Sequence, residues 1–255
     1  MIDMEWIVVS FSWMHLLILV VLVAVAVGVL ALAWRSWRRK GTDAVISLTL
    51  TLSAFCAVIG VLGAIAAVVG ALANTQVEMT VPVSTYWPVL PDGVTISGTT
   101  ATVAGGGFTQ ADVWVEGAST GARVLWGIGQ ALGGLVPAAI AGLIALVCFQ
   151  LLRGAAFAPV VARAAMITAV VVLVGGMSAD VLCGIGGSMV SHALLAWTSA
   201  SGTSDPAADP LLNWPQATFS ANFPLWPIGA GLGFAALAAV FRYGGRLQRD
   251  TEGLV

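Results

Sequence analysis

Charged residues are scarce in this chain. Asp, Glu, Lys and Arg make up 9% of its 255 residues, whereas hydrophobic residues make up 59%. Soluble globular domains typically carry about 25% charged residues. This shortage excludes an ordinary water-soluble domain and predicts that lipid surrounds most of the polypeptide. The net charge of -2 adds little, since the side of the membrane on which each charge lies carries the information.

Cysteine and histidine are also rare, and their positions argue against two kinds of chemistry. Cys56, Cys148 and Cys183 all lie inside apolar runs, so we expect small buried hydrophobic side chains rather than a set of disulfides. His15 and His192 have no acidic residue at ligand spacing, and neither belongs to an H-E-x-x-H pattern. We therefore predict no metal site and no cofactor.

Long hydrophobic runs, by contrast, are abundant. A helix needs about 20 consecutive apolar residues to cross the hydrocarbon core of a bilayer. Five segments reach or approach this length, namely residues 13–34, 44–73, 124–152, 160–195 and 225–241. The second and fourth exceed a straight crossing, so we expect them to tilt, bend or project beyond the lipid. The sequence thus predicts an all-α membrane bundle of five transmembrane helices.

The basic residues predict the orientation of this bundle. Nine of the ten lie on one side of the predicted spans, namely Arg35, Arg38, Arg39, Lys40, Arg153, Arg163, Arg242, Arg246 and Arg249. The positive-inside rule assigns that side to the cytoplasm, so we expect the N-terminus outside and the C-terminus in the cytoplasm. Asp3 and Glu5 precede the first span and basic residues follow it, the reverse of a secretory signal peptide. We therefore expect the first span to remain in the mature protein.

Two segments are predicted to lie outside the membrane, on the side opposite to the basic residues. Residues 74–121 contain "VEMTVPV", "VTISGTTATVA" and "FTQADVWVEG", which are rich in Val and Thr and alternate partly with period two. They predict a small antiparallel β-sheet between the second and third helices, with "LPDG" and the "AGGGF" stretch as turns. Residues 198–224 are rich in Ser, Pro, Asp and Asn, which predicts an ordered or partly ordered loop over the sheet.

Two longer stretches carry a family resemblance. The C-terminal "AAVFRYGGRLQRDTEGLV" and the central "RVLWGIGQALGGLVPAAIAGLIALVCFQLLRGAAFAPVVARAA" resemble the bacterial membrane family called domain of unknown function 2975. The resemblance covers residues 44–255 as a four-helix membrane domain, which leaves residues 1–43 as an additional N-terminal transmembrane helix with a basic cytoplasmic loop. It implies a multi-pass protein of the bacterial cytoplasmic (inner) membrane that works beside a small helix-turn-helix regulator. It implies no established activity.

One acidic residue, Asp180, lies inside a predicted span. On a helix it shares a small and polar face, composed of Gly176, Asp180, Gly184, Gly187 and Ser191. Ser178 and Ser188 lie nearby, and Arg123 is a candidate counter-ion from the outer end of the third span. An isolated carboxylate in lipid is costly, so we expect Asp180 to be protonated, hydrogen-bonded or open to an aqueous vestibule on the outer side. A structural polar clamp and an ion or ligand site are both consistent with this face.

The C-terminal arginines form a second candidate site. Arg242, Arg246 and Arg249 recur at three- to four-residue spacing and share one face if the last helix continues through them. Gly244 and Gly245 are an alternative end for that helix. The arginines either anchor the topology beside anionic lipid headgroups or contact a cytoplasmic partner.

Glycine-rich stretches inside the spans predict helix packing rather than nucleotide binding. "GIGQALGG", "GIGGS" and "IGAGLG" lack the Lys-Ser/Thr ending of a phosphate loop. Gly129 with Gly133, and Gly229 with Gly233, have the spacing that lets two helix backbones approach. The "GMSAD" run has no general base within reach of its serine, so we predict no catalytic residue.

Two functions from different classes fit these features. A non-enzymatic envelope sensor or regulatory partner fits the two outer segments and the lack of a catalytic constellation. A small transporter, channel or lipid-handling protein would use the Asp180 face, although five unequal spans without an inverted repeat argue against a transporter. We predict the first, with the lipid bilayer and a cytoplasmic protein as partners and no direct nucleic-acid contact. The oligomeric state does not follow from the sequence.

Overall fold

The computed structural model describes residues 42–88, 98, 100, 101, 103–155, 157–197 and 214–252. The described chain is mostly helical and contains a small two-stranded antiparallel sheet. Four predictions lie outside these residues. They are the first span at 13–34 with the basic residues Arg35, Arg38, Arg39 and Lys40, the "LPDG" turn, most of the "VTISGTTATVA" strand, and the loop from 198 to 213.

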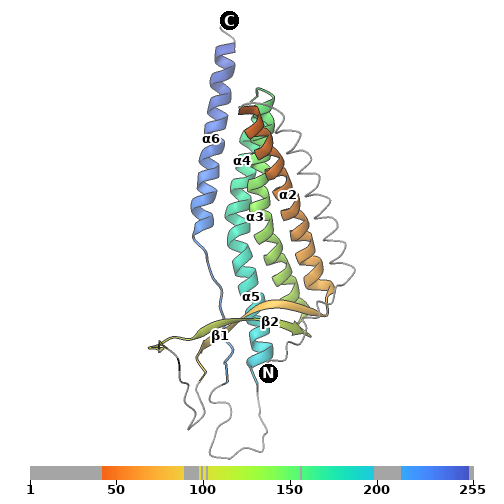
Figure 1. Ribbon diagram of the computed structural model, residues 1–255, viewed down its shortest axis with the longest axis vertical. Helices are drawn as coiled ribbons and strands as arrows, with labels where there is room; N and C mark the ends of the chain where they lie inside the picture. The colour runs from red at the N-terminus through yellow and green to blue at the C-terminus, as the bar shows by residue number, and fades with distance from the viewer. Residues whose placement is uncertain are drawn as a thin grey trace, which may run out of the picture. The chain divides into compact units, whose positions relative to one another are not determined.

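Four helical stretches of the described chain are long and apolar enough to cross a membrane, namely Asp43–Ala73, Thr120–Leu152, Pro159–Leu195 and Trp226–Asp250. They comprise α2 (Thr42–Ala73), α3 (Thr120–Leu152), α4 (Pro159–Val170) with η1 (Val171–Gly175) and α5 (Gly176–Leu195), and α6 (Trp226–Glu252) (Figure 1). The predicted spans at 44–73, 124–152, 160–195 and 225–241 are therefore confirmed as long apolar helices. The orientation of these helices in the membrane and the additional helix at residues 13–34 remain predictions.

The fourth predicted span carries an irregularity that hydropathy does not reveal. Five residues, Val171–Gly175, form a π-helical turn between α4 and α5. A π turn widens the helix and inserts an extra residue, so the faces before and after it are out of phase.

The chain divides into two compact units. The helical unit contains the described residues of 42–61, 137–168 and 234–252, and the sheet unit contains those of 62–136 and 169–233. Each unit has its own buried cluster. In the helical unit Leu143, Ala165 and Ala238 are buried together from three helices. Small side chains let these helices approach closely.

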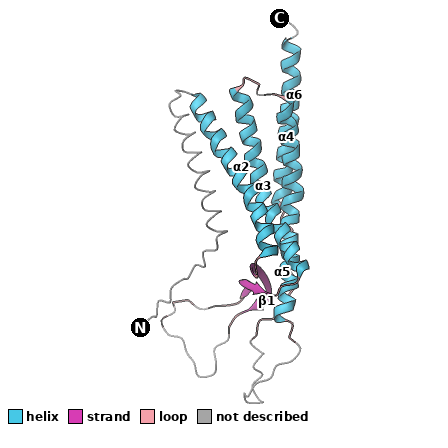
Figure 2. Cartoon of the chain, turned by 90° about the vertical axis from the view of Figure 1, so that its right-hand side faces the viewer, coloured by secondary structure: helices cyan, strands magenta, loops and turns pink. Residues whose placement is uncertain are grey.

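The sheet unit contains both strands. β1 (Gln76–Tyr86) pairs with β2 (Phe108–Glu116), and Gln76 lies opposite Glu116. Both views show the strands at the end of α5 (Figures 1 and 2). The predicted antiparallel sheet is confirmed for these two strands. The predicted turn at "AGGGF" contains Gly106 with a φ of 89°, a conformation that favours glycine.

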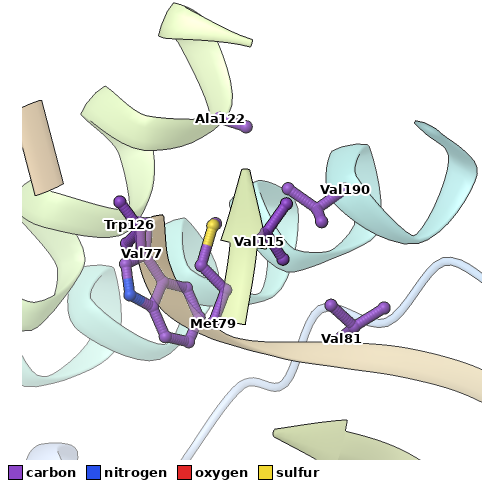
Figure 3. Close-up of a cluster of buried hydrophobic side chains, with 7 residues drawn as sticks. All are labelled: Val77, Met79, Val81, Val115, Ala122, Trp126 and Val190. Carbon is purple, nitrogen blue, oxygen red and sulfur yellow. The ribbon is translucent and has the colours of Figure 1, made fainter. Parts of the chain in front are cut away.

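Alternation along β1 buries one face of the sheet. Met79 of β1 is fully buried, and its side chain lies between Trp126 of α3 and Val115 of β2 (Figure 3). The same cluster is completed by Val77, Val81, Ala122 and Val190. The sheet is therefore packed onto the ends of α3 and α5 rather than attached only by its connections.

The other edge of β1 contacts the described end of the outer loop. The backbone N–H of Ser84 donates to the carbonyl of Gln216 at 2.9 Å, and Val83 forms an isolated bridge with Ala217. This pairing coincides with the irregular register between Pro82 and Tyr86, where β1 departs from β2. Gln216 and Ala217 of the loop thus lie against the strand.

Candidate functional site

Asp180 is exposed on α5 and borders a cavity of about 360 Å³ in the sheet unit. We call it the Asp180 cavity, and its polar lining includes Thr80, Thr109, Gln110, Gln130, Ser220 and Asn222. These residues come from both strands, from α3 and from the outer loop. The carboxylate therefore borders hydroxyl and amide groups that can bind water or a polar ligand.

The wall of this cavity is formed where α3 and α5 come close together. A Cβ at Gly129 would lie 2.6 Å from the sulfur of Cys183 and 2.9 Å from the carbonyl oxygen of Ala179. The Gln130 amide donates to the Cys183 sulfur at 3.7 Å, and the thiol lies 3.9 Å from the carbonyl oxygen of Trp126. Cys183 is thus half-buried at a helix contact, and Cys148 is buried. Cys56 is exposed on α2, so the prediction of a buried side chain is wrong for that cysteine.

A second cavity, of about 480 Å³, borders the same part of the sheet unit. Thr80, Trp126 and Gln130 line both cavities, while Glu78 and Asp112 line only the second. The Thr80 hydroxyl donates to Asp112 Oδ1 at 2.6 Å across the two strands. The two cavities therefore present three carboxylates, those of Glu78, Asp112 and Asp180.

Two serines of α5 connect three segments of the sheet unit. Ser191 Oγ donates to the carbonyl of Pro82 in β1 at 2.6 Å and accepts from the N–H of Thr218 in the outer loop at 3.3 Å. Ser188 Oγ accepts from the N–H of Ser220 at 3.0 Å and donates to the carbonyl of Gly184 at 2.7 Å. Both side chains are buried, with exposures of 2% for Ser188 and 0% for Ser191. We call this pair the serine clamp.

Glycines on the same helix make this contact possible. A Cβ at Gly184 would lie 2.6 Å from the carbonyl oxygen of Ser220, and one at Gly187 would overlap the carbonyl oxygen of Thr80. Any larger residue would push the strand and the loop off the helix. The predicted small face of α5 therefore packs against the sheet and the loop at Gly184, Gly187 and Ser191. At Gly176 it packs against Pro227 of α6, and at Asp180 it is exposed.

The two predicted glycine pairs differ in their packing. Gly129 lies against α5, and Gly133 is at ordinary contact distance from Ala179. No atom of the described residues lies within 4 Å of a Cβ added at Gly229 or Gly233, so neither glycine mediates close packing within that part of the chain. Gly231 has that role instead, because a Cβ added there would lie 3.1 Å from the carbonyl oxygen of Ala169. The spacing pattern alone did not reveal which face of α6 is covered.

Arg123 does not act as the expected counter-ion. Its Nε donates to the carbonyl of Ala71 at 2.7 Å, and a terminal guanidinium nitrogen donates to the carbonyl of Asn74. These are carbonyls at the C-terminal end of α2, where a cation satisfies unpaired acceptors and complements the helix dipole. The guanidinium therefore caps α2, and Arg123 does not line the Asp180 cavity.

The remaining predicted residues lie apart from this cavity. Ser178 is half-buried on α5 and is not part of the cavity lining. Arg242, Arg246 and Arg249 lie on α6, which continues through Gly244 and Gly245 to Glu252. His192 is exposed on α5, and the described residues contain no group of three or more His, Cys, Asp or Glu that could hold a metal ion.

Sequence reasoning missed Glu78, Thr80, Asp112 and Gln130. Gln130 was detectable, since it is an amide among apolar residues inside a predicted span. The strand residues were not, because their proximity to α5 depends on contacts between residues far apart in the sequence.

Comparisons with family models, with curated proteins and with solved structures found no match. The resemblance to the bacterial membrane family is neither supported nor contradicted by them.

Proposed function

We propose that this chain is a non-enzymatic envelope sensor or regulatory protein of the bacterial cytoplasmic membrane, with the sheet outside and the α6 end in the cytoplasm. The observation that carries the proposal is the serine clamp. It joins β1, the loop and α5 through the hydrogen bonds of two buried serine side chains. A change in the strand or the loop is thereby transmitted to a helix of the membrane domain.

The proposed orientation is supported by the charges of the two units. Among the described residues, Arg123 is the single basic side chain of the sheet unit, and its guanidinium caps α2. The helical unit carries the other five, namely Arg153, Arg163, Arg242, Arg246 and Arg249. This segregation fits the positive-inside rule with five spans, an outside N-terminus and a cytoplasmic C-terminus.

Exposed aromatic side chains support an interfacial or ligand-contacting role for the sheet. Trp87 and Phe108 stack with ring centroids 5.3 Å apart and an interplanar angle of 12°. Trp114 is also exposed on β2. Aromatic rings of this kind favour the headgroup level of a bilayer or an apolar ligand.

The resemblance to a bacterial membrane family suggests which cytoplasmic protein receives the signal. Members of that family are suspected of working beside a small helix-turn-helix regulator, so the cytoplasmic end of α6 is the proposed contact. Regulation then requires that the outer segments have two states and that the partner distinguishes them.

The orientation is tested by single cysteines in a cysteine-free variant. Glu116→Cys should react with a membrane-impermeant maleimide in intact cells, whereas Asp250→Cys should react only after the cells are opened. The reverse labelling pattern would refute the orientation.

The regulatory role is tested by transcript profiles of a deletion strain complemented with wild type, Ser191→Ala or Ser178→Ala. Wild type and Ser178→Ala should restore the profile under envelope stress. Ser191→Ala should fail although it accumulates in the membrane at a comparable level. An unchanged profile after deletion would contradict the proposal.

The partner is tested by crosslinking in native membranes, with the full chain and with a chain that lacks residues 243–255. The proposal predicts that the truncated chain loses the regulator. If it retains every partner, the α6 contact is wrong.

One observation favours a second candidate function. Asp180 borders a polar cavity, and its carboxylate is not paired with Arg123. A protein that conducts or transports cations would require such an unpaired carboxylate. Proton or cation flux into proteoliposomes that Asp180→Asn abolishes would favour this alternative, and equal flux in both proteins would remove it.

A further inference from the structure

The helical unit contains a cavity of about 310 Å³ beside the first turn of α4 and the last turns of α6. Three arginines line it, namely Arg163 of α4 and Arg242 and Arg249 of α6. We call it the arginine cavity. Arg246 belongs to the same run of arginines on α6, yet it does not line the cavity.

Phe157, in the turn before α4, fixes the shape of this cavity. A Cβ at Gly244 would lie 2.5 Å from the Phe157 ring, and one at Gly245 would lie 2.8 Å from the Phe157 carbonyl oxygen. The ring also packs on Phe241 with centroids 6.3 Å apart. The paired glycines therefore continue the helix and hold the turn against α6, so the arginines of both segments face one space.

The cavity concentrates positive charge that the described chain does not neutralise. No Asp or Glu of the described residues lines it. Within that part of the chain, neither the Arg163 nor the Arg242 side chain makes a hydrogen bond or ion pair, and Arg249 Nε donates to the carbonyl of Gly245 at 3.1 Å. Three guanidinium groups around one space favour an anion with several acceptor oxygens.

The rest of the lining is apolar and includes Met166 and Ile167 of α4, both exposed. An inorganic anion would gain nothing from these side chains, whereas the glycerol and first methylene groups of a lipid would pack on them. Basic cavities between helices at the membrane surface bind the headgroups of anionic lipids.

We propose that the arginine cavity binds the phosphate of an anionic glycerophospholipid, with Arg163, Arg242 and Arg249 around the phosphate and the acyl chains beside Met166 and Ile167. The site depends on the chain spanning a membrane. It does not depend on the sensor function or on which leaflet the site faces. Its role would be to hold α4 and α6 together through a shared lipid.

The test compares purified proteins in a mild uncharged detergent by native mass spectrometry and by titration with short-chain lipids. The probes are dihexanoyl phosphatidylglycerol, dihexanoyl phosphatidylcholine, glycerol 3-phosphate and inorganic phosphate. The variants are Arg163→Gln and Arg242→Gln, singly and together. The matched control is Arg246→Gln, which removes the same charge from α6 outside the cavity.

We expect the wild-type protein to prefer phosphatidylglycerol over phosphatidylcholine. Each cavity arginine that is removed should weaken the binding of phosphatidylglycerol about fivefold, and the double variant should weaken it about 25-fold. Arg246→Gln should bind within about twofold of wild type. The double variant Arg163→Lys and Arg242→Lys should retain intermediate affinity, since lysine keeps the charge and loses the planar fork.

Two outcomes would overturn the inference. Equal losses in Arg246→Gln and in the cavity variants would show that general surface charge attracts the lipid. Equal affinity for inorganic phosphate and phosphatidylglycerol would show that the site takes a free anion and not a lipid. Unfolding midpoints of all variants distinguish lost binding from lost folding, and an unfolded variant is replaced by the lysine pair.

Discussion

Ser191 of α5 and Pro82 of β1 are joined by a hydrogen bond of 2.6 Å, although 109 residues separate them in the sequence. Proline has no N–H to offer a neighbouring strand, but its carbonyl still needs a donor. The buried hydroxyl supplies this donor, and its oxygen accepts the N–H of Thr218 at the same time. One hydroxyl therefore satisfies backbone groups from two segments that would otherwise be unpaired.

We expect Ser191→Ala to destabilise the protein by about 1–3 kcal/mol, because the carbonyl of Pro82 and the N–H of Thr218 would be left without a partner. Chemical unfolding in a mild detergent, followed by tryptophan fluorescence, measures the change. Ser178→Ala is the matched control on the same helix and should change stability by less than about 0.5 kcal/mol. Equal effects of the two variants would show that the clamp contributes nothing specific.

The helices could be predicted from the sequence because the membrane imposes a local requirement. A stretch such as 124–152 must be apolar along its whole length, and the structure has a helix at Thr120–Leu152. Alternation in "VEMTVPV" likewise predicted β1, since every second side chain faces the core. Patterns that depend on a single segment were therefore informative.

Contacts between distant segments could not be predicted in this way. Arg123 was a plausible partner for Asp180 because both residues were expected near the same end of their helices. Its guanidinium instead donates to two carbonyls at the end of α2. Whether Gly129 or Gly229 packs closely depends on which face a neighbour covers, and the glycine spacing is the same in both pairs. The π turn at Val171–Gly175 leaves no mark in hydropathy either.

Substitution of Gly187 and Gly229 should give opposite results. Gly187→Ala places a methyl group against the carbonyl of Thr80, so we expect a loss of about 1–3 kcal/mol or more. The methyl group of Gly229→Ala meets no atom of the described residues within 4 Å, and alanine favours a helix, so this variant should be unchanged or up to about 1 kcal/mol more stable. Unfolding midpoints of the two purified variants provide the comparison. A neutral Gly187→Ala would mean that β1 does not lie against α5.

Met79→Ala should be among the most destabilising changes in the sheet unit. Its side chain is fully buried between Trp126 and Val115, so truncation leaves a cavity and should cost about 2–5 kcal/mol. Met189 of α5 is 41% exposed, and Met189→Ala should cost less than about 1 kcal/mol. Thermal unfolding in detergent separates the two. Similar losses would contradict the position of Met79 in the core.

Asp180 should be accessible to water in the folded protein. In a variant that lacks the native cysteines Cys56, Cys148 and Cys183, Asp180→Cys should react with a water-soluble, positively charged thiol reagent, because the position is exposed beside a polar cavity. Ser191→Cys, which is fully buried, is the slow-reacting control. Lipid around position 180 would instead make both variants unreactive.

A double-mutant cycle tests whether Arg123 and Asp180 interact, because it measures the coupling energy between them. Arg123→Gln should cost about 1.5–3 kcal/mol, because two charge-assisted hydrogen bonds to the end of α2 are lost. Asp180→Asn has no bond to Arg123 to lose, so the double variant should equal the sum of the single variants within about 0.5 kcal/mol. Chemical unfolding of the four proteins closes the cycle. A coupling energy above about 1 kcal/mol would show that the two charges interact. The Asp180 carboxylate would then stabilise the Arg123 guanidinium that caps α2, and it would not serve to bind a ligand in the Asp180 cavity.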